Sequence, residues 1–171
     1  WALVEGKGAS EEAKIIETRG INPVTCSSEQ VKEIIAEGLL PQIKATEVEG
    51  IYFYGAGCIA NAPATLELQR TLQEIFPQAT TIVVATDMLG AAHALCGHDK
   101  GIVCILGTGS NSAFYDGEQL VKNVPPLGYI LGDEGGGANL GKTFVSNALK
   151  GLMPSEIVDL MYEECQTSYA Q

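Results

Sequence analysis

The sequence predicts an α/β fold in two units, and three observations carry this prediction. Strand patterns alternate with helix patterns through the N-terminal half. Thr80–Thr86 is a continuous run rich in β-branched residues, which is typical of a buried parallel strand. A new pattern of hairpin strands starts at Gly101, after the polar and turn-prone segment 97–101. We therefore place a domain boundary near residue 99, which gives units of 1–98 and 99–171.

The first unit shows capping and stop signals for its helices. Ser27 and Gln30 form a capping box before apolar residues at helical spacing. Pro63 stands near the start of a second helix and Pro77 stops it. In chain order we expect strands at 1–5, 14–18, 50–54 and 80–86, and helices after Ser27, after Pro63 and over 88–96.

The second unit opens with a glycine loop, Gly107-Thr108-Gly109-Ser110-Asn111, between the strand patterns 101–106 and 112–115. Dinucleotide fingerprints and Walker A loops run from a strand into a helix, so neither applies to a loop between two strands. The glycines still allow close backbone approach, and the amides and hydroxyls are donors for a phosphate. An ordinary hairpin turn is the alternative. Helices are expected over about 138–149 and 156–164.

Composition restricts the function. The 171 residues are 46% hydrophobic and 18% charged, as in ordinary globular proteins. The net charge of −11, with no Lys/Arg cluster, argues against a nucleic acid or an anionic membrane surface as partner. No apolar run approaches the roughly 20 residues of a membrane span. The residues from Trp1 onward have no basic leader pattern, so we expect no secretory signal. The five cysteines lack a Cys-x-x-Cys pair, so we expect reduced thiols in a cytoplasmic protein, with Cys104 in the core.

Three segments could carry chemistry. Asp87 follows a hydrophobic strand, at the sheet edge where α/β proteins bind ligands, although it could simply cap the next helix. The segment 132–137 holds two carboxylates among four glycines; it suits a close ligand approach, and a solvated acidic loop is the alternative. Asn22 precedes Pro23, and this pair alone indicates a structural turn.

The remaining candidates are weaker. We expect His93 to be packed or half-buried within a helix and Lys142 to face solvent. The spacing of His, Cys and Asp residues fits no metal site, and no Gly-x-Ser-x-Gly element indicates a serine hydrolase.

Taken together, Asp87, the Gly-Thr-Gly-Ser-Asn loop and Gly-Asp-Glu-Gly at 132–135 resemble N-acetylglucosamine kinases. These belong to the sugar-kinase, Hsp70 and actin-like ATPase superfamily, in the BadF/BadG/BcrA/BcrD branch. The resemblance covers about residues 1–155. It implies an actin-like (ribonuclease H-like) fold of two units that flank a cleft, with the second unit incomplete. It also implies ATP and Mg²⁺ as cofactors, an amino sugar as substrate and a homodimer.

The resemblance assigns roles residue by residue. Gly107, Thr108, Gly109 and Ser110 resemble the second phosphate loop, and Asp87 resembles the base that binds the sugar and takes the proton of its reacting hydroxyl. Asn22 and Asp133 resemble sugar contacts. Leu127 and Gly128 fall where a tryptophan and a glycine lie beside the sugar in the animal enzyme, so the leucine affects fine specificity.

The chain departs from the family at both ends. We expect the first phosphate loop of the family to lie before Trp1, and the adenosine motif beyond Gln171. Two other functions remain open: an ATPase activator of an iron–sulfur dehydratase, for which Cys58 is the one cysteine in a glycine loop, and a non-catalytic sugar-binding regulator.

Overall fold

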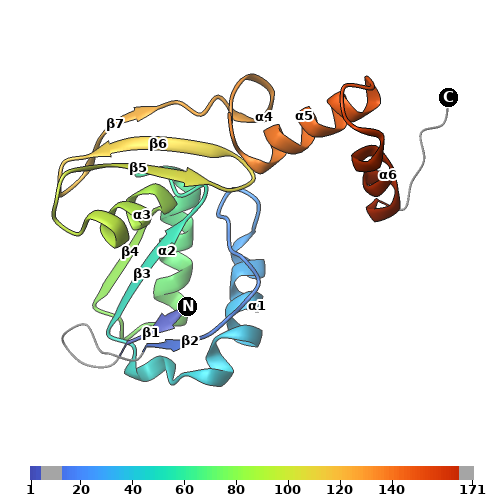
Figure 1. Ribbon diagram of the computed structural model, residues 1–171. Coiled ribbons are helices and arrows are strands. Elements are labelled where there is room, and N and C mark those ends of the chain that lie inside the picture. The colour runs from blue at the N-terminus through green and yellow to red at the C-terminus, as the bar shows by residue number, and fades with distance from the viewer. Residues whose placement is uncertain (5–12, 166–171) are drawn as a thin grey trace. The chain divides into compact units, whose positions relative to one another are not determined.

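The computed structural model describes residues 1–4 and 13–165 and has a mixed α/β fold, as predicted (Figure 1). It forms two compact units, Trp1–Gly97 and His98–Gln171. Among the described residues, no helix is long and apolar enough to cross a membrane.

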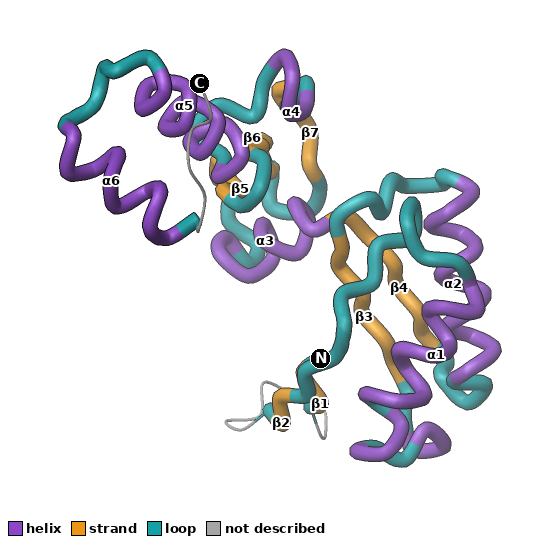
Figure 2. The backbone as a smooth tube through the Cα atoms, turned by 90° about the vertical axis from the view of Figure 1, so that its right-hand side faces the viewer, coloured by secondary structure: helices purple, strands orange, loops and turns teal. Residues whose placement is uncertain are grey.

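A pair of parallel strands organises the first unit. β3 (Gly50–Gly55) pairs with β4 (Thr81–Thr86) in a register that runs from Gly50 opposite Thr81 to Gly55 opposite Thr86. Helix α2 (Pro63–Ile75) connects them, and α2 and α1 (Ser28–Gly38) lie on the same side of the strands (Figure 2). Because the strands are parallel, the loop after β3 and the residue after β4 lie at the same edge. Helix α3 (Asp87–Cys96) starts at that edge.

Short elements complete this unit. β1 (Ala2–Leu3) pairs antiparallel with β2 (Lys14–Ile15) in a separate small sheet. Two 3₁₀-helices, Leu40–Gln42 and Ala45–Glu47, connect α1 to β3.

The helix boundaries follow the predicted signals. The Ser27 side chain accepts a hydrogen bond from the Gln30 amide at 3.3 Å, and the Gln30 side chain accepts one from the Ser27 amide at 2.8 Å. These bonds satisfy two amides that the first turn of α1 would otherwise leave unpaired. Pro63 is the first residue of α2, where its missing N–H costs nothing. The capping box and the proline signals are confirmed.

The core of this unit lies between α1, α2 and β3. Ile35 and Leu72 are fully buried, and Ile51 of β3 packs in the same cluster. Burial of each such side chain contributes about 1.5–3 kcal/mol. The cluster therefore fixes β3, and with it the position of the loop that follows this strand.

The second unit is built on an antiparallel sheet in the order β5-β6-β7. Its strands are β5 (Gly101–Leu106), β6 (Ser110–Tyr115) and β7 (Leu120–Val124). Three helices follow: α4 (Gly128–Leu131), α5 (Gly137–Leu149) and α6 (Ser155–Glu164). β6 begins at Ser110, two residues earlier than predicted, so three residues form the turn.

The prediction that Cys104 lies in the core is wrong. Val103 of β5 is buried, whereas Ile102, Cys104 and Leu106 are exposed. A continuous apolar run suggests a strand covered on both faces, but this antiparallel sheet buries only one face of β5 in the described residues.

Candidate functional site

Asp87 is the first residue of α3, directly after β4. Its Oδ1 accepts hydrogen bonds from the Met88 amide at 2.9 Å and from Thr86 Oγ1 at 3.0 Å. The cap position itself belongs to Thr86, so Asp87 is not the N-cap that the alternative interpretation required. Both hydrogen bonds use the same oxygen, and Asp87 is half-buried. The second oxygen, Oδ2, is therefore the one that can face a ligand.

Asn22 lies in a turn that its own side chain stabilises. Its Oδ1 accepts a 2.9 Å hydrogen bond from the Val24 amide, and its main-chain oxygen accepts one from the Cys26 amide at 2.9 Å. The Asn-Pro pair therefore forms the structural turn that the sequence indicates, and the side-chain oxygen Oδ1 of Asn22 is used within that turn. The amide nitrogen Nδ2 makes no hydrogen bond within the described part of the chain, so it can donate to a ligand.

The loop after β3 lies beside both Asn22 and Asp87. A Cβ on Gly57 would lie 2.5 Å from Asn22 Oδ1, so the Gly57 backbone lies against that side chain. Gly57 also has φ +82°, a conformation that glycine adopts without strain. The next residue, Cys58, is close enough to Asp87 for the charge of the carboxylate to act on the thiol. Asn22, this loop and Asp87 thus share one edge of the first unit.

Cys58 is a buried thiol at this edge. Burial raises the pKa of the Cys58 thiol above its ordinary value, and the negative charge of Asp87 raises it further, against an opposing hydrogen bond with the Gly55 backbone. A thiolate is therefore disfavoured, which makes Cys58 a packing residue rather than a nucleophile.

In the second unit, the glycine loop forms a tight turn with outward-facing donors. The Gly107 amide donates to the Gly109 oxygen at 2.9 Å. Within the described residues, the amides of Thr108 and Gly109 donate to no protein acceptor. Adjacent free amides at a turn are suited to an anion.

The segment 126–133 folds back on itself beside this loop. The Asp133 amide donates to Pro126 oxygen, and the Gly132 amide to Gly128 oxygen, both at 2.9 Å. Leu127 and Asp133 have φ +57° and +60°, which costs energy for residues other than glycine. The predicted sugar-contact residues Leu127, Gly128 and Asp133 are therefore brought together.

The Asp133 carboxylate lies against the glycine loop. Its Oδ1 accepts a long, 3.4 Å hydrogen bond from the Ser110 amide. A Cβ on Gly109 would lie 2.8 Å from Oδ2, so a side chain at 109 would have to displace this carboxylate. The two motifs of the second unit thus form one site, in which Asp133 contacts the loop directly.

The predicted site residues fall into two groups, one in each unit. Asn22 and Asp87 lie in the first unit, and Gly107–Ser110, Leu127, Gly128 and Asp133 lie in the second. The structure brings residues together within each group. The cleft between the units and the functional role of every site residue stay predictions.

Sequence reasoning missed the contribution of the loop after β3. Gly57 and Cys58 were noted only as part of a glycine loop, although the parallel pairing of β3 and β4 could have placed them beside Asp87. Lys142 is exposed, as expected, and its Nζ donates to Tyr129 oxygen at 3.3 Å and lies 4.9 Å from the centre of the Tyr129 ring. It thereby ties α5 to α4.

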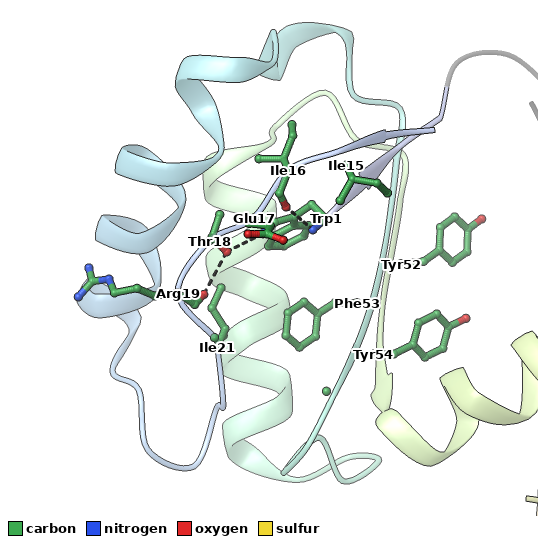
Figure 3. A pocket seen from close by; sticks show the side chains of 12 residues that line it. Trp1, Ile15, Ile16, Glu17, Thr18, Arg19, Ile21, Tyr52, Phe53 and Tyr54 are labelled. Atoms are coloured by element: carbon green, nitrogen blue, oxygen red, sulfur yellow. Dashed lines mark hydrogen bonds between the residues drawn. The ribbon is translucent and has the colours of Figure 1, made fainter. Parts of the chain in front are cut away.

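A groove of about 630 Å³ runs beside β3 (Figure 3). Phe53 points into it, 5.8 Å from Trp1 between ring centres, whereas Tyr52 and Tyr54 lie on the opposite side of the strand. Gly55 and Ile21 are among the residues that line the groove, and they adjoin in sequence the loop after β3 and Asn22.

The described residues hold no group of three or more His, Cys, Asp or Glu side chains that could bind a metal ion together. A cation of the Mg²⁺ type needs fewer protein ligands, because it keeps several waters and binds one or two carboxylates with phosphate oxygens. Asp133, beside the glycine loop, is a carboxylate of that kind.

Comparison with solved structures finds similar proteins. No protein-family model matches the chain, and no curated protein matches it. A solved structure from Porphyromonas gingivalis, named as a putative N-acetylglucosamine kinase, is 46% identical with a TM-score of 0.80. The match covers 87% of this chain and 53% of that one, so the chain spans about half the length of this relative. The chain is thus similar over most of its length to part of a protein that bears a sugar-kinase name.

Proposed function

We propose that the chain is part of an ATP-dependent kinase of amino sugars with an actin-like ATPase fold, and that its preferred substrate is N-acetylglucosamine, phosphorylated at the 6-position. The observation that carries the proposal is the glycine loop with the free amides of Thr108 and Gly109, packed against Asp133. The similarity to the solved structure supports it.

The phosphates of ATP bind the turn at Gly107–Ser110 in this proposal. The amides of Thr108 and Gly109 donate to phosphate oxygens, and the hydroxyls of Thr108 and Ser110 add donors. Backbone donors of this kind suit a chain with a net charge of −11, because they attract an anion without Lys or Arg.

Asp87 is the general base of the proposed reaction. The protein fixes one oxygen of the carboxylate through Thr86 and Met88, which leaves the other to accept the proton of the sugar hydroxyl. Proton transfer to a positioned group contributes about 10²–10⁴-fold to a rate. Asn22 Nδ2 donates to a sugar hydroxyl from the same edge of the first unit.

Mg²⁺ would neutralise phosphate charge during the transfer. The Asp133 carboxylate, which lies against the glycine loop, is the side chain of the second unit that would hold it, with waters completing the shell. Phosphoryl transfer needs positioning and charge neutralisation more than covalent chemistry, and the residues of both groups serve these purposes.

The alternative of an iron–sulfur-linked activator is less well supported. Cys58 is the cysteine that would contribute to a shared cluster, and it is only 1% exposed. A thiol so buried cannot reach a cluster at the surface of a dimer. A non-catalytic sugar-binding regulator would keep the same fold and lose turnover.

The test is a coupled assay of ADP release by the full-length protein with a panel of sugars. The panel contains N-acetylglucosamine, glucosamine and N-acetylmuramic acid, each with Mg²⁺ and ATP. We expect release that requires a sugar and is fastest with N-acetylglucosamine. Binding of ATP without sugar-dependent release would contradict the kinase and lead to iron analysis for the activator, or to sugar-binding measurements for the regulator.

A further inference from the structure

The start of α5 holds the carbonyl groups of the glycine loop. The Gly137 amide donates to Gly107 oxygen at 2.8 Å, and the Ala138 amide donates to Thr108 oxygen at 2.9 Å. The N-cap residue, Gly136, makes no side-chain cap bond. The first amides of a helix need acceptors from outside it, and here the loop supplies them in place of a capping side chain.

These two hydrogen bonds fix which way the loop amides point. In a trans peptide the C=O and the following N–H point in opposite directions, and the structure contains no cis peptide among its described residues. The Gly107 carbonyl therefore shares a plane with the Thr108 amide, and the Thr108 carbonyl with the Gly109 amide. With both carbonyls directed at α5, both amides point away from it, which is the polarity that an anion requires.

Gly136 is the residue on which this arrangement depends. It is buried, and a Cβ on it would lie 2.6 Å from the carbonyl carbon and 2.8 Å from the Cα of Gly109. Backbone therefore packs directly against backbone, and this close approach brings the amides of Gly137 and Ala138 to the loop. A side chain at 136 must push the start of α5 away from the loop, because backbone cannot rotate aside as a side chain can.

We propose that Gly136 is a positioning residue for nucleotide binding, because it docks α5 on the glycine loop and so turns the amides of Thr108 and Gly109 toward the phosphates. The identity of the anion as a nucleotide phosphate rests on the proposed function. The docking of α5 on the glycine loop does not depend on that function.

The chain offers matched variants for a test. Gly136→Ala places a methyl group against the Gly109 backbone. Gly141→Ala adds the same methyl group to the same helix, where nothing lies within 4 Å. Gly137→Ala is intermediate, since its Cβ would lie 3.3 Å from Gly107 oxygen. Each of the three variants replaces one glycine by alanine in the first two turns of α5 or at its N-cap. The change in intrinsic helix propensity is therefore of the same type in all three.

Hydrogen exchange of the Gly137 and Ala138 amides measures the docking without any ligand. We expect exchange in Gly136→Ala to be at least about tenfold faster, since both amides lose their acceptors, and exchange in Gly141→Ala to stay unchanged. The amides of β6 serve as an internal reference for unfolding of the unit. Unchanged exchange at 137 and 138 in Gly136→Ala would overturn the proposal.

Steady-state kinetics of the full-length protein then measure positioning. A misplacement of about 1 Å can cost on the order of 10²-fold, so we expect Gly136→Ala to raise KM for ATP by at least about tenfold while KM for the sugar changes little. An equal rise in both KM values would overturn a role specific to the nucleotide. Faster exchange in a protein with no sugar-dependent turnover would refute the proposed function and leave the docking in place.

Discussion

Gly90 of α3 lies against the side chain of Tyr54 on β3. A Cβ on Gly90 would come within 2.7 Å of Tyr54 Cβ and 2.8 Å of its Cγ. The Tyr54 hydroxyl also hydrogen-bonds to His93 Nδ1, at 3.0 Å, in the next turn of the helix. The contact at Gly90 therefore brings α3 close to β3, and α3 begins with Asp87. The small residue behind Asp87 is needed for packing of the helix on its own sheet.

Replacement of Gly90 by alanine should destabilise the first unit. Alanine in a helix is favoured over glycine by about 1 kcal/mol, but overpacking at Tyr54 costs about 1–3 kcal/mol. We expect a net loss in the free energy of unfolding of up to about 2 kcal/mol, measured by denaturant titration. Gly141→Ala, with no neighbour to meet, should instead gain up to about 1 kcal/mol. Equal stabilisation by the two substitutions would contradict the contact.

Asn22→Asp separates the structural role of this side chain from its proposed binding role. Aspartate keeps an oxygen to accept from the Val24 amide but has no Nδ2 donor. We expect the free energy of unfolding to change by less than about 0.5 kcal/mol. KM for the sugar should rise about tenfold, the usual worth of one hydrogen bond.

Asn22→Ala is the companion variant, since it also removes the acceptor of the turn. In addition to the rise in KM for the sugar, it should lower the free energy of unfolding by about 1 kcal/mol. If KM for the sugar is unchanged in Asn22→Asp, Asn22 does not bind the sugar.

Cys58 should make stability depend on alkaline pH. Its pKa is raised in the folded protein, mainly by burial, so the folded state holds the thiol proton more tightly than the unfolded state does. The stability contribution is fully present below the ordinary thiol pKa of about 8.5. It is lost as the pH rises from there through the raised value.

The measurement is the free energy of unfolding between pH 7 and 10 for the wild type and Cys58→Ala. The variant should be less stable at neutral pH because of its smaller side chain, and it should show a shallower decline above about pH 8.5. Parallel curves for the two proteins would show that the thiol does not ionise differently in the two states.

Much of the fold could be predicted because local signals decide it. The capping box at Ser27, the proline at the start of α2 and the β-branched run of β4 each act within a few residues. The structure agrees with the first two and with the parallel strand, although the residues of β4 are only partly buried. Cys104 shows the limit of this approach. The apolar run of β5 does not reveal whether a second layer covers the strand, because coverage depends on elements far away in sequence.

The residues of the candidate site were chosen from the sequence and stay predictions, whereas their contacts could not be predicted at all. The two glycine motifs were found from composition, yet a pattern alone could not show that Gly136 packs on Gly109 or that Asp133 covers the loop. Such backbone contacts leave no periodic signal. The role of Asp133 as a sugar contact stays a prediction, and its position requires that one carboxylate serve both the loop and a ligand.

The most direct test of the proposed mechanism is the sugar-dependent kcat of Asp87→Asn in the full-length protein, with Asp159→Asn, an exposed carboxylate on α6, as control. Asparagine keeps an oxygen for the Met88 and Thr86 bonds but cannot take up the proton, so the fold and KM for the sugar should stay close to wild type. We predict that kcat falls by about 10²–10⁴-fold in Asp87→Asn and is unchanged in Asp159→Asn. Turnover of Asp87→Asn at the wild-type rate would contradict the account of Asp87 as the base.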